Sequence, residues 1–112
     1  MAHIELNVLA RFTAKPGMEQ RVREALERMI EPSLNEEANV GYALHQGIKD
    51  ASVFLLYEGW KSQEGLQHHM NQPYFKRMDD DLRDTLERPY EVTLIHKIAG
   101  AVPIEAEHIS AG

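Results

Sequence analysis

The sequence of 112 residues contains no cysteine, which excludes disulfides, thiolate metal ligands and a cysteine nucleophile. It also lacks any apolar run near the roughly 18 residues that a membrane span requires. The net charge of −6 argues against binding to nucleic-acid phosphates or to an anionic membrane surface. The N-terminus has no basic segment followed by a long apolar stretch, so no signal peptide is indicated. We therefore expect a cytoplasmic protein with neither nucleic acid nor membrane as a partner.

What is present is the composition of an ordinary globular domain, with 43% hydrophobic and 27% charged residues. A chain of this length buries a single modest core. We expect one domain over residues 1–98 and a C-terminal tail over residues 99–112. The tail is poor in structural signals but carries Val102, Ile104 and Ile109. These apolar positions predict that it contacts a partner subunit.

Four stretches have the apolar and polar composition typical of strands: residues 3–14, 42–48, 53–60 and 90–98. The second and third are joined by a short polar link, which predicts a hairpin. Two helical regions separate the strands. One apolar stripe runs through residues 18–34, and a second helical region begins after Ser62 as N-cap and is interrupted at Pro73.

The resulting order, β-α-β-β-α-β, is that of the ferredoxin-like α+β fold, a four-stranded antiparallel sheet with helices on one face. The acidic run 79–81 in the second helical region is expected to face water rather than bind metal, because consecutive helical residues point in different directions.

Both faces of the expected sheet are apolar. In residues 53–60 one face carries Phe54, Leu56 and Trp60, and the other carries Val53, Leu55 and Tyr57. A sheet covered by helices on one side only would leave the second apolar face in water. The simplest arrangement that buries it is a homodimer in which two sheets pack face to face.

The stretch "YEGWKSQEGLQHHMNQPYFK" resembles the signature of the antibiotic biosynthesis monooxygenase superfamily, which includes small quinol monooxygenase-like proteins. The family pattern is a strand that ends in Tyr-Glu-x-Trp, a helix cap, a helical Leu, a His three residues later, and Pro-x-Phe. The matching residues are Tyr57, Glu58, Trp60, Ser62, Leu66, His69, Pro73 and Phe75. "ARFTAKPG" and "GYALHQ" also look like the family's first strand with its turn and its second strand, so the resemblance covers residues 4–98.

The resemblance implies a dimeric α/β barrel whose best-known members oxygenate phenols or quinols with O2 and use no metal, flavin or haem. We therefore expect no cofactor, with a small aromatic molecule and O2 as partners. The haem-degrading branch uses Asn, Trp and His at positions where this chain has Ala10, His69 and Asp79, which argues against haem. Two alternatives stay open: an isomerase of a small carbonyl compound, and a dimeric small-ligand-binding or stress-related protein without catalysis.

His69 and Glu58 are the candidate catalytic residues. His69 matches the family histidine and titrates near neutral pH, so it is either a general base or donor toward a phenol, or a structural histidine bonded to Glu58 or a backbone carbonyl. Glu58 shares a strand face with Trp60, where a carboxylate must be paired or have a raised pKa. His68 lies roughly 100° around the helix and is expected at the surface. No H-E-x-x-H spacing indicates a metal site.

Five residues are candidates for substrate binding. Trp60 forms either an aromatic wall of a pocket or a core anchor. Arg11 either steers an acidic or phenolic ligand or pairs with an acid across a dimer. Tyr42 and His45 lie on opposite faces of their strand, so only one of them lines a given cavity. Tyr74 is a weaker candidate.

These residues lead to one hypothesis about the site. If the strand face that carries Glu58 and Trp60 lies under the helices, both side chains and His69 line one cavity between sheet and helix. If that face points away from the helices, His69 stands alone.

Overall fold

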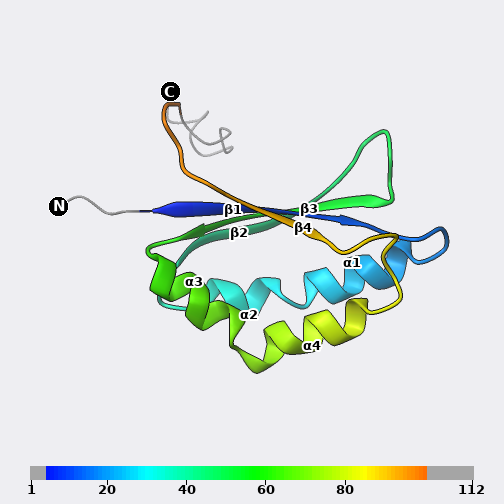
Figure 1. The fold of residues 1–112 in the computed structure, drawn as a ribbon, viewed down its shortest axis with the longest axis horizontal. Helices are drawn as coiled ribbons and strands as arrows, with labels where there is room; N and C mark the ends of the chain where they lie inside the picture. The colour runs from blue at the N-terminus through cyan, green and yellow to red at the C-terminus, as the bar shows by residue number, and fades with distance from the viewer. Residues whose placement is uncertain (1–4, 101–112) are drawn as a thin grey trace, which may run out of the picture.

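A computed structural model, which describes residues 5–100, has a four-stranded sheet with its helices on one side (Figure 1). Its elements in chain order are β1 (Leu6–Thr13), α1 (Glu19–Glu27), α2 (Ile30–Leu34), β2 (Asn39–Gln46), β3 (Val53–Trp60), α3 (Gln63–Met70), α4 (Pro73–Leu82) and β4 (Glu91–Ile95). The strand order is β2-β3-β1-β4, and all neighbours are antiparallel. The predicted ferredoxin-like α+β fold is confirmed.

The helix expected over residues 18–34 is two helices, which corrects that prediction. α1 ends at Glu27 and α2 begins at Ile30, and between them Met29 N–H bonds Leu26 C=O at 3.1 Å. Pro32 explains the break, since proline has no N–H for the carbonyl four residues earlier and its ring clashes with it. α2 packs against β2, so the segment that follows α2 lies next to the sheet.

The second helical region follows its local signals. Ser62 caps α3 by accepting the backbone N–H of Gly65 at 3.0 Å, and Pro73 is the first residue of α4. The helical path is interrupted between α3 and α4, so α3 ends over the inner face of the sheet. His69 is buried on the side of α3 that faces Trp60 of β3.

The core lies between the helices and the inner sheet face, where Val8, Phe12, Leu56 and Trp60 are all buried. β4 is shorter than the expected 90–98 strand, and its residues are exposed along its whole length. Val92 is 54% exposed, although it extends the inner face beside Ala10. The layer between sheet and helices is therefore open on the β4 side.

The outer sheet face, opposite the helices, carries exposed apolar side chains as expected. Leu9 is 36% exposed, Tyr57 37% and Ile95 39%, and they lie on three adjacent strands. The tail positions Val102, Ile104 and Ile109 lie outside the described residues. In residues 5–100, no helix is both long and apolar enough to cross a bilayer.

Candidate functional site

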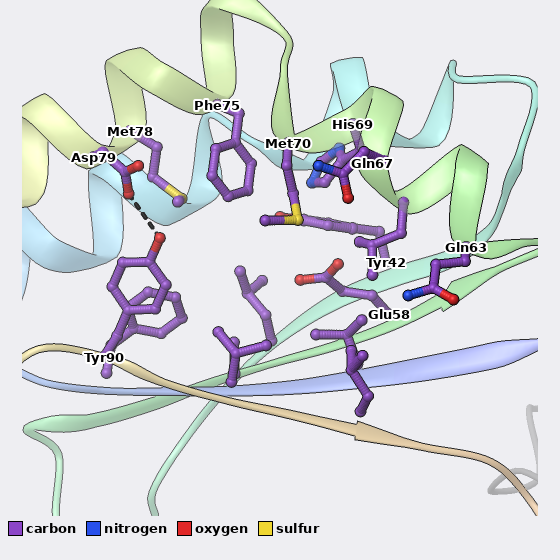
Figure 2. Close-up of a pocket in the computed structure, with 17 residues that line it drawn as sticks. Tyr42, Glu58, Gln63, Gln67, His69, Met70, Phe75, Met78, Asp79 and Tyr90 are labelled. Carbon is purple, nitrogen blue, oxygen red and sulfur yellow. Dashed lines mark hydrogen bonds between the residues drawn. The ribbon is translucent and has the colours of Figure 1, made fainter.

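A cavity of about 510 Å³ lies between the inner sheet face and the helices α3 and α4 (Figure 2). Its walls are mostly apolar, with strand residues such as Val8 and Leu56 on one side and the helix residues Met70 and Phe75 on the other. The polar residues that line it are Tyr42, Glu58, Gln63, Gln67, His69, Asp79 and Tyr90. This combination of apolar walls with a few convergent polar groups is typical of small-molecule sites.

Glu58 lies on the inner face of β3, where its residue is only 6% exposed. The indole Nε1 of Trp60 donates a hydrogen bond to its Oε1 at 2.9 Å. Burial is the largest effect on this carboxyl and raises the pKa of Glu58 to about 7. The hydrogen bond from Trp60 lowers the pKa, and the charge of Glu36 raises it. The carboxyl can therefore bind or release a proton near neutral pH.

His69 is almost completely buried, at 1% exposure, and lines the same cavity. Its ring lies against Trp60, with centroids 4.4 Å apart. Its Nδ1 lies 2.7 Å from Oε2 of Glu36, which belongs to the segment between α2 and β2. Glu58 bonds Trp60 instead, so the expected partners of His69, Glu58 or a backbone carbonyl, are replaced by Glu36.

Burial lowers the pKa of His69, although the hydrogen bond and charge of Glu36 act in the opposite direction. The imidazole is therefore neutral at neutral pH, with its proton on one nitrogen only. A carboxylate only accepts hydrogen bonds, so the contact with Glu36 requires the proton on Nδ1. Nε2 then carries a lone pair. It is buried and has no hydrogen-bond partner among the described residues.

Three of the aromatic side chains that contact His69 are Tyr42, Trp60 and Tyr74, and of these three Tyr42 lines the cavity. Tyr42 lines the cavity from β2, and burial, with the charge of Glu58, raises its pKa. Trp60 is fully buried and does not line the cavity, so it is a core anchor that holds Glu58. Tyr74 lies behind His69 and donates its hydroxyl hydrogen to Glu36. Burial and this bond raise the pKa of Tyr74.

Arg11 and His45 lie away from the cavity. Both pair with Leu55 across the sheet, Arg11 from β1 and His45 from β2, and all three belong to the outer face. The alternation of side chains along each strand turns them away from the helices. His68 is exposed, as expected, with its Nε2 2.9 Å from Nε2 of Gln72.

The far end of the cavity holds a pair that the sequence did not indicate. The hydroxyl of Tyr90 donates to Oδ1 of Asp79 at 2.7 Å, drawn as the dashed line in Figure 2. The ring of Tyr90 lies 4.7 Å from that of Phe12, centroid to centroid. Asp79 is exposed to water, as the sequence predicted, but it also lines the cavity. Within residues 5–100, no three His, Asp or Glu side chains are grouped to hold a metal ion.

The proposed cluster of Glu58, Trp60 and His69 thus forms, because the helices cover the face of β3 that carries the first two. Glu58 and His69 line the cavity and Trp60 connects them from behind. The arrangement offers a neutral imidazole as proton acceptor and a carboxyl that titrates near pH 7, inside apolar walls. Such groups suit proton transfer to and from a small organic molecule.

Sequence relatives extend over most of the chain. A Mycobacterium tuberculosis protein, "Putative monooxygenase Rv0793", is 28% identical over 88 residues, which are 79% of this chain and 86% of the relative. The Synechocystis protein sll1783 is 28% identical over 92 residues. Those residues are 82% of this chain but 62% of that relative, so the chain spans less than two thirds of its length.

Solved structures and a family model agree with these relatives. Rv0793 superposes with a TM-score of 0.82 at 26% identity, covering 88% of this chain and 99% of that one. PA3566 from Pseudomonas aeruginosa also gives 0.82 at 26% identity, over 88% and 98%. The family model "Antibiotic biosynthesis monooxygenase" matches residues 6–80, most of the 112 residues. The chain therefore belongs to the antibiotic biosynthesis monooxygenase family.

Proposed function

We propose that the protein is a cofactor-independent monooxygenase that oxidises a small phenolic or quinol-type aromatic with O2. Family membership supports the reaction class, since a relative bears the name of a monooxygenase. The observation that carries the proposal is His69, which lines an apolar cavity and whose buried Nε2 has no hydrogen-bond partner within residues 5–100. A phenol hydroxyl supplies the donor that this nitrogen lacks.

The reaction needs two proton-transfer groups and no bound cofactor. Nε2 of His69 takes the phenol proton, and the electron-rich phenolate carbon bonds to O2, which gives a peroxide on the ring. The imidazolium returns its proton to the terminal peroxide oxygen. Ionised Glu58 then removes the ring hydrogen as a proton while the O–O bond breaks, and this proton joins the departing hydroxide as water. The substrate is oxidised by four electrons to a quinone, with one oxygen atom of O2 in the quinone and the other in water.

The charges around the cavity favour a neutral substrate. Glu58 and Asp79 line it with carboxyl groups, and its lining within residues 5–100 includes no Lys or Arg. A carboxylated aromatic would bring a like charge into an apolar space, which is costly. A volume of about 510 Å³ accommodates a bicyclic phenol such as a naphthol.

The test is O2 uptake by the purified protein with 1-naphthol and with reduced menadione, corrected for autoxidation in buffer. We expect His69→Gln to lower kcat by about 100-fold, the usual contribution of a positioned general base. His68→Gln, at the exposed neighbour, is the matched control and should keep the wild-type rate.

Other outcomes would identify the alternatives. An absence of uptake above buffer across a broad panel of phenols and quinols would remove the monooxygenase proposal. A changed substrate NMR spectrum without O2 consumption would indicate an isomerase. Ligand-dependent thermal stabilisation without turnover would indicate a binding protein.

The proposal includes a homodimer that packs through the outer sheet face. The exposed apolar residues Leu9, Tyr57 and Ile95 support it, because a monomer leaves this face in water. Arg11 and His45 would then lie at the interface rather than at the substrate. Sedimentation should give a dimer at micromolar concentration, and a stable monomer would contradict this. Deletion of the tail, residues 99–112, should raise the dimer dissociation constant, and an unchanged constant would mean that the tail does not contribute to the dimer.

A further inference from the structure

Two polar side chains from separate parts of the chain meet behind His69, on the side away from the cavity. Oε2 of Glu36 lies 2.7 Å from Nδ1 of His69 and also accepts the hydroxyl hydrogen of Tyr74. The Glu36 side chain is only 10% exposed. Neither Glu36 nor Tyr74 lines the cavity, so neither touches a substrate there.

This arrangement selects one tautomer of the imidazole. If the proton were on Nε2, the lone pair of Nδ1 would face a carboxylate oxygen at 2.7 Å, and the two would repel each other. With the proton on Nδ1, the contact is a charge-assisted hydrogen bond. Tyr74 holds the same oxygen in place from α4, so the carboxylate cannot turn away without losing a second bond.

We infer that Glu36 and Tyr74 are positioning residues that keep the proton of neutral His69 on Nδ1 and its lone pair on Nε2, facing the cavity. The inference rests on the proposed function for the identity of the proton donor. A buried histidine in the opposite tautomer would present an N–H to the substrate, and this could not accept the phenol proton.

The packing around the imidazole of His69 keeps the ring from turning over. The imidazole is fully buried and packs against Trp60, with ring centroids 4.4 Å apart, and against Phe75, which meets it edge-on at 5.2 Å. A buried ring in contact with two aromatic side chains cannot exchange the positions of its nitrogens by turning over without disturbing the core. The tautomer therefore depends on the partner of Nδ1.

Several titratable groups lie near His69, but the one that contacts its Nδ1 and fixes the tautomer is Glu36. Tyr42 meets the ring from β2 with centroids 5.7 Å apart, and Tyr74 meets it from α4 at 6.1 Å. Glu58, on β3, hydrogen-bonds Trp60, and His68 is the exposed neighbour on the same helix. Among the described residues, the carboxylate in contact with the imidazole is therefore that of Glu36.

The test uses the isosteric variant Glu36→Gln, with Glu37→Gln as the matched control on the exposed neighbouring residue. ¹⁵N NMR of the histidine rings reports the tautomer and the pKa of His69 and needs no turnover. We expect wild type and Glu37→Gln to show the Nδ1–H tautomer. Glu36→Gln should mix the tautomers, since an amide both donates and accepts, and should lower the pKa of His69 because the imidazolium loses its counter-charge.

The kinetics should change in a pattern that mere destabilisation does not produce. In Glu36→Gln, kcat should fall by about tenfold or more with little change in KM, and the acid limb of the kcat profile should move to lower pH. Tyr74→Phe removes the hydroxyl that donates a hydrogen bond to the Glu36 carboxylate, so that the full charge of this carboxylate acts on His69. The pKa of His69 should then rise, and the acid limb should move to higher pH.

These opposite shifts decide the inference. If both variants keep the wild-type tautomer and the wild-type pKa of His69, Glu36 and Tyr74 are structural only and the inference is overturned. If Glu36→Gln does not fold, the Tyr74→Phe shift alone decides. If the NMR shifts appear while the wild-type protein consumes no O2 with any substrate, the positioning role holds and the monooxygenase proposal fails.

Discussion

Glu58 should make the free energy of unfolding depend on pH in a direction that is unusual for an acidic residue. Its pKa in the folded protein is about 7, against 4.5 in the unfolded chain, because burial disfavours the charged form. The folded state therefore binds this proton more tightly than the unfolded state does. The stability that Glu58 contributes is fully present below about pH 4.5 and is lost as the pH rises through about 7.

The size of the effect follows from the difference between these two pKa values. One pKa unit corresponds to about 1.4 kcal/mol, so the shift is equivalent to roughly 3 kcal/mol. Glu58→Gln removes the titration but keeps the shape of the side chain and an oxygen that can accept from Trp60. Relative to wild type, the variant should therefore gain roughly 3 kcal/mol between pH 4.5 and pH 8.5.

The assay is urea unfolding of wild type and Glu58→Gln at fixed protein concentration, from pH 4.5 to 8.5. The difference between the two free energies of unfolding is the quantity to follow, because contributions from other titrating groups, His69 included, largely cancel in it. The m-values should agree, which shows that the unfolded states are comparable. Parallel stability curves, with a constant difference at all pH values, would refute the claim that Glu58 titrates near pH 7.

Two further substitutions test other parts of the site. Trp60→Phe keeps an aromatic core residue but removes the N–H donor that lowers the pKa of Glu58. A carboxyl ¹³C NMR titration should therefore show the pKa of Glu58 rising above about 7. An unchanged pKa would contradict the role of the indole. Gly65→Ala should cost about 1–3 kcal/mol in thermal unfolding, since an added Cβ would lie 2.4 Å from Cβ of Ala38. Gly41→Ala, whose Cβ would meet nothing within 4 Å, is its control and should melt near wild type.

The elements whose ends depend on local chemistry could be predicted from the sequence. Ser62 begins α3 and Pro73 begins α4 because a capping hydroxyl and a missing N–H act within one turn. The break between α1 and α2 was not predicted, because the apolar stripe continues through Met29 and hides it. Pro32 acts on the carbonyl four residues earlier, so its effect lies upstream of the residue that causes it.

The site could be predicted only in part. Period-two alternation placed Glu58 and Trp60 on one face of β3, and the family resemblance singled out His69. Arg11 and His45 were candidates because residue type alone does not show which face a strand turns toward the helices. The structure resolves this, since the register pairs both with Leu55 on the outer face.

The sequence by itself determined the order of the strands and helical regions, which residues of one strand share a face, and the family to which the chain is similar. Those properties depend on neighbours within a few residues, through backbone geometry and side-chain periodicity. The partner of His69 was decided by the tertiary structure alone. Glu36 lies 33 residues earlier, in a polar connection without any recognisable motif. Glu36 and His69 meet only because α2 packs against β2 and α3 packs against β3, which brings their segments together. No local sequence pattern encodes this proximity.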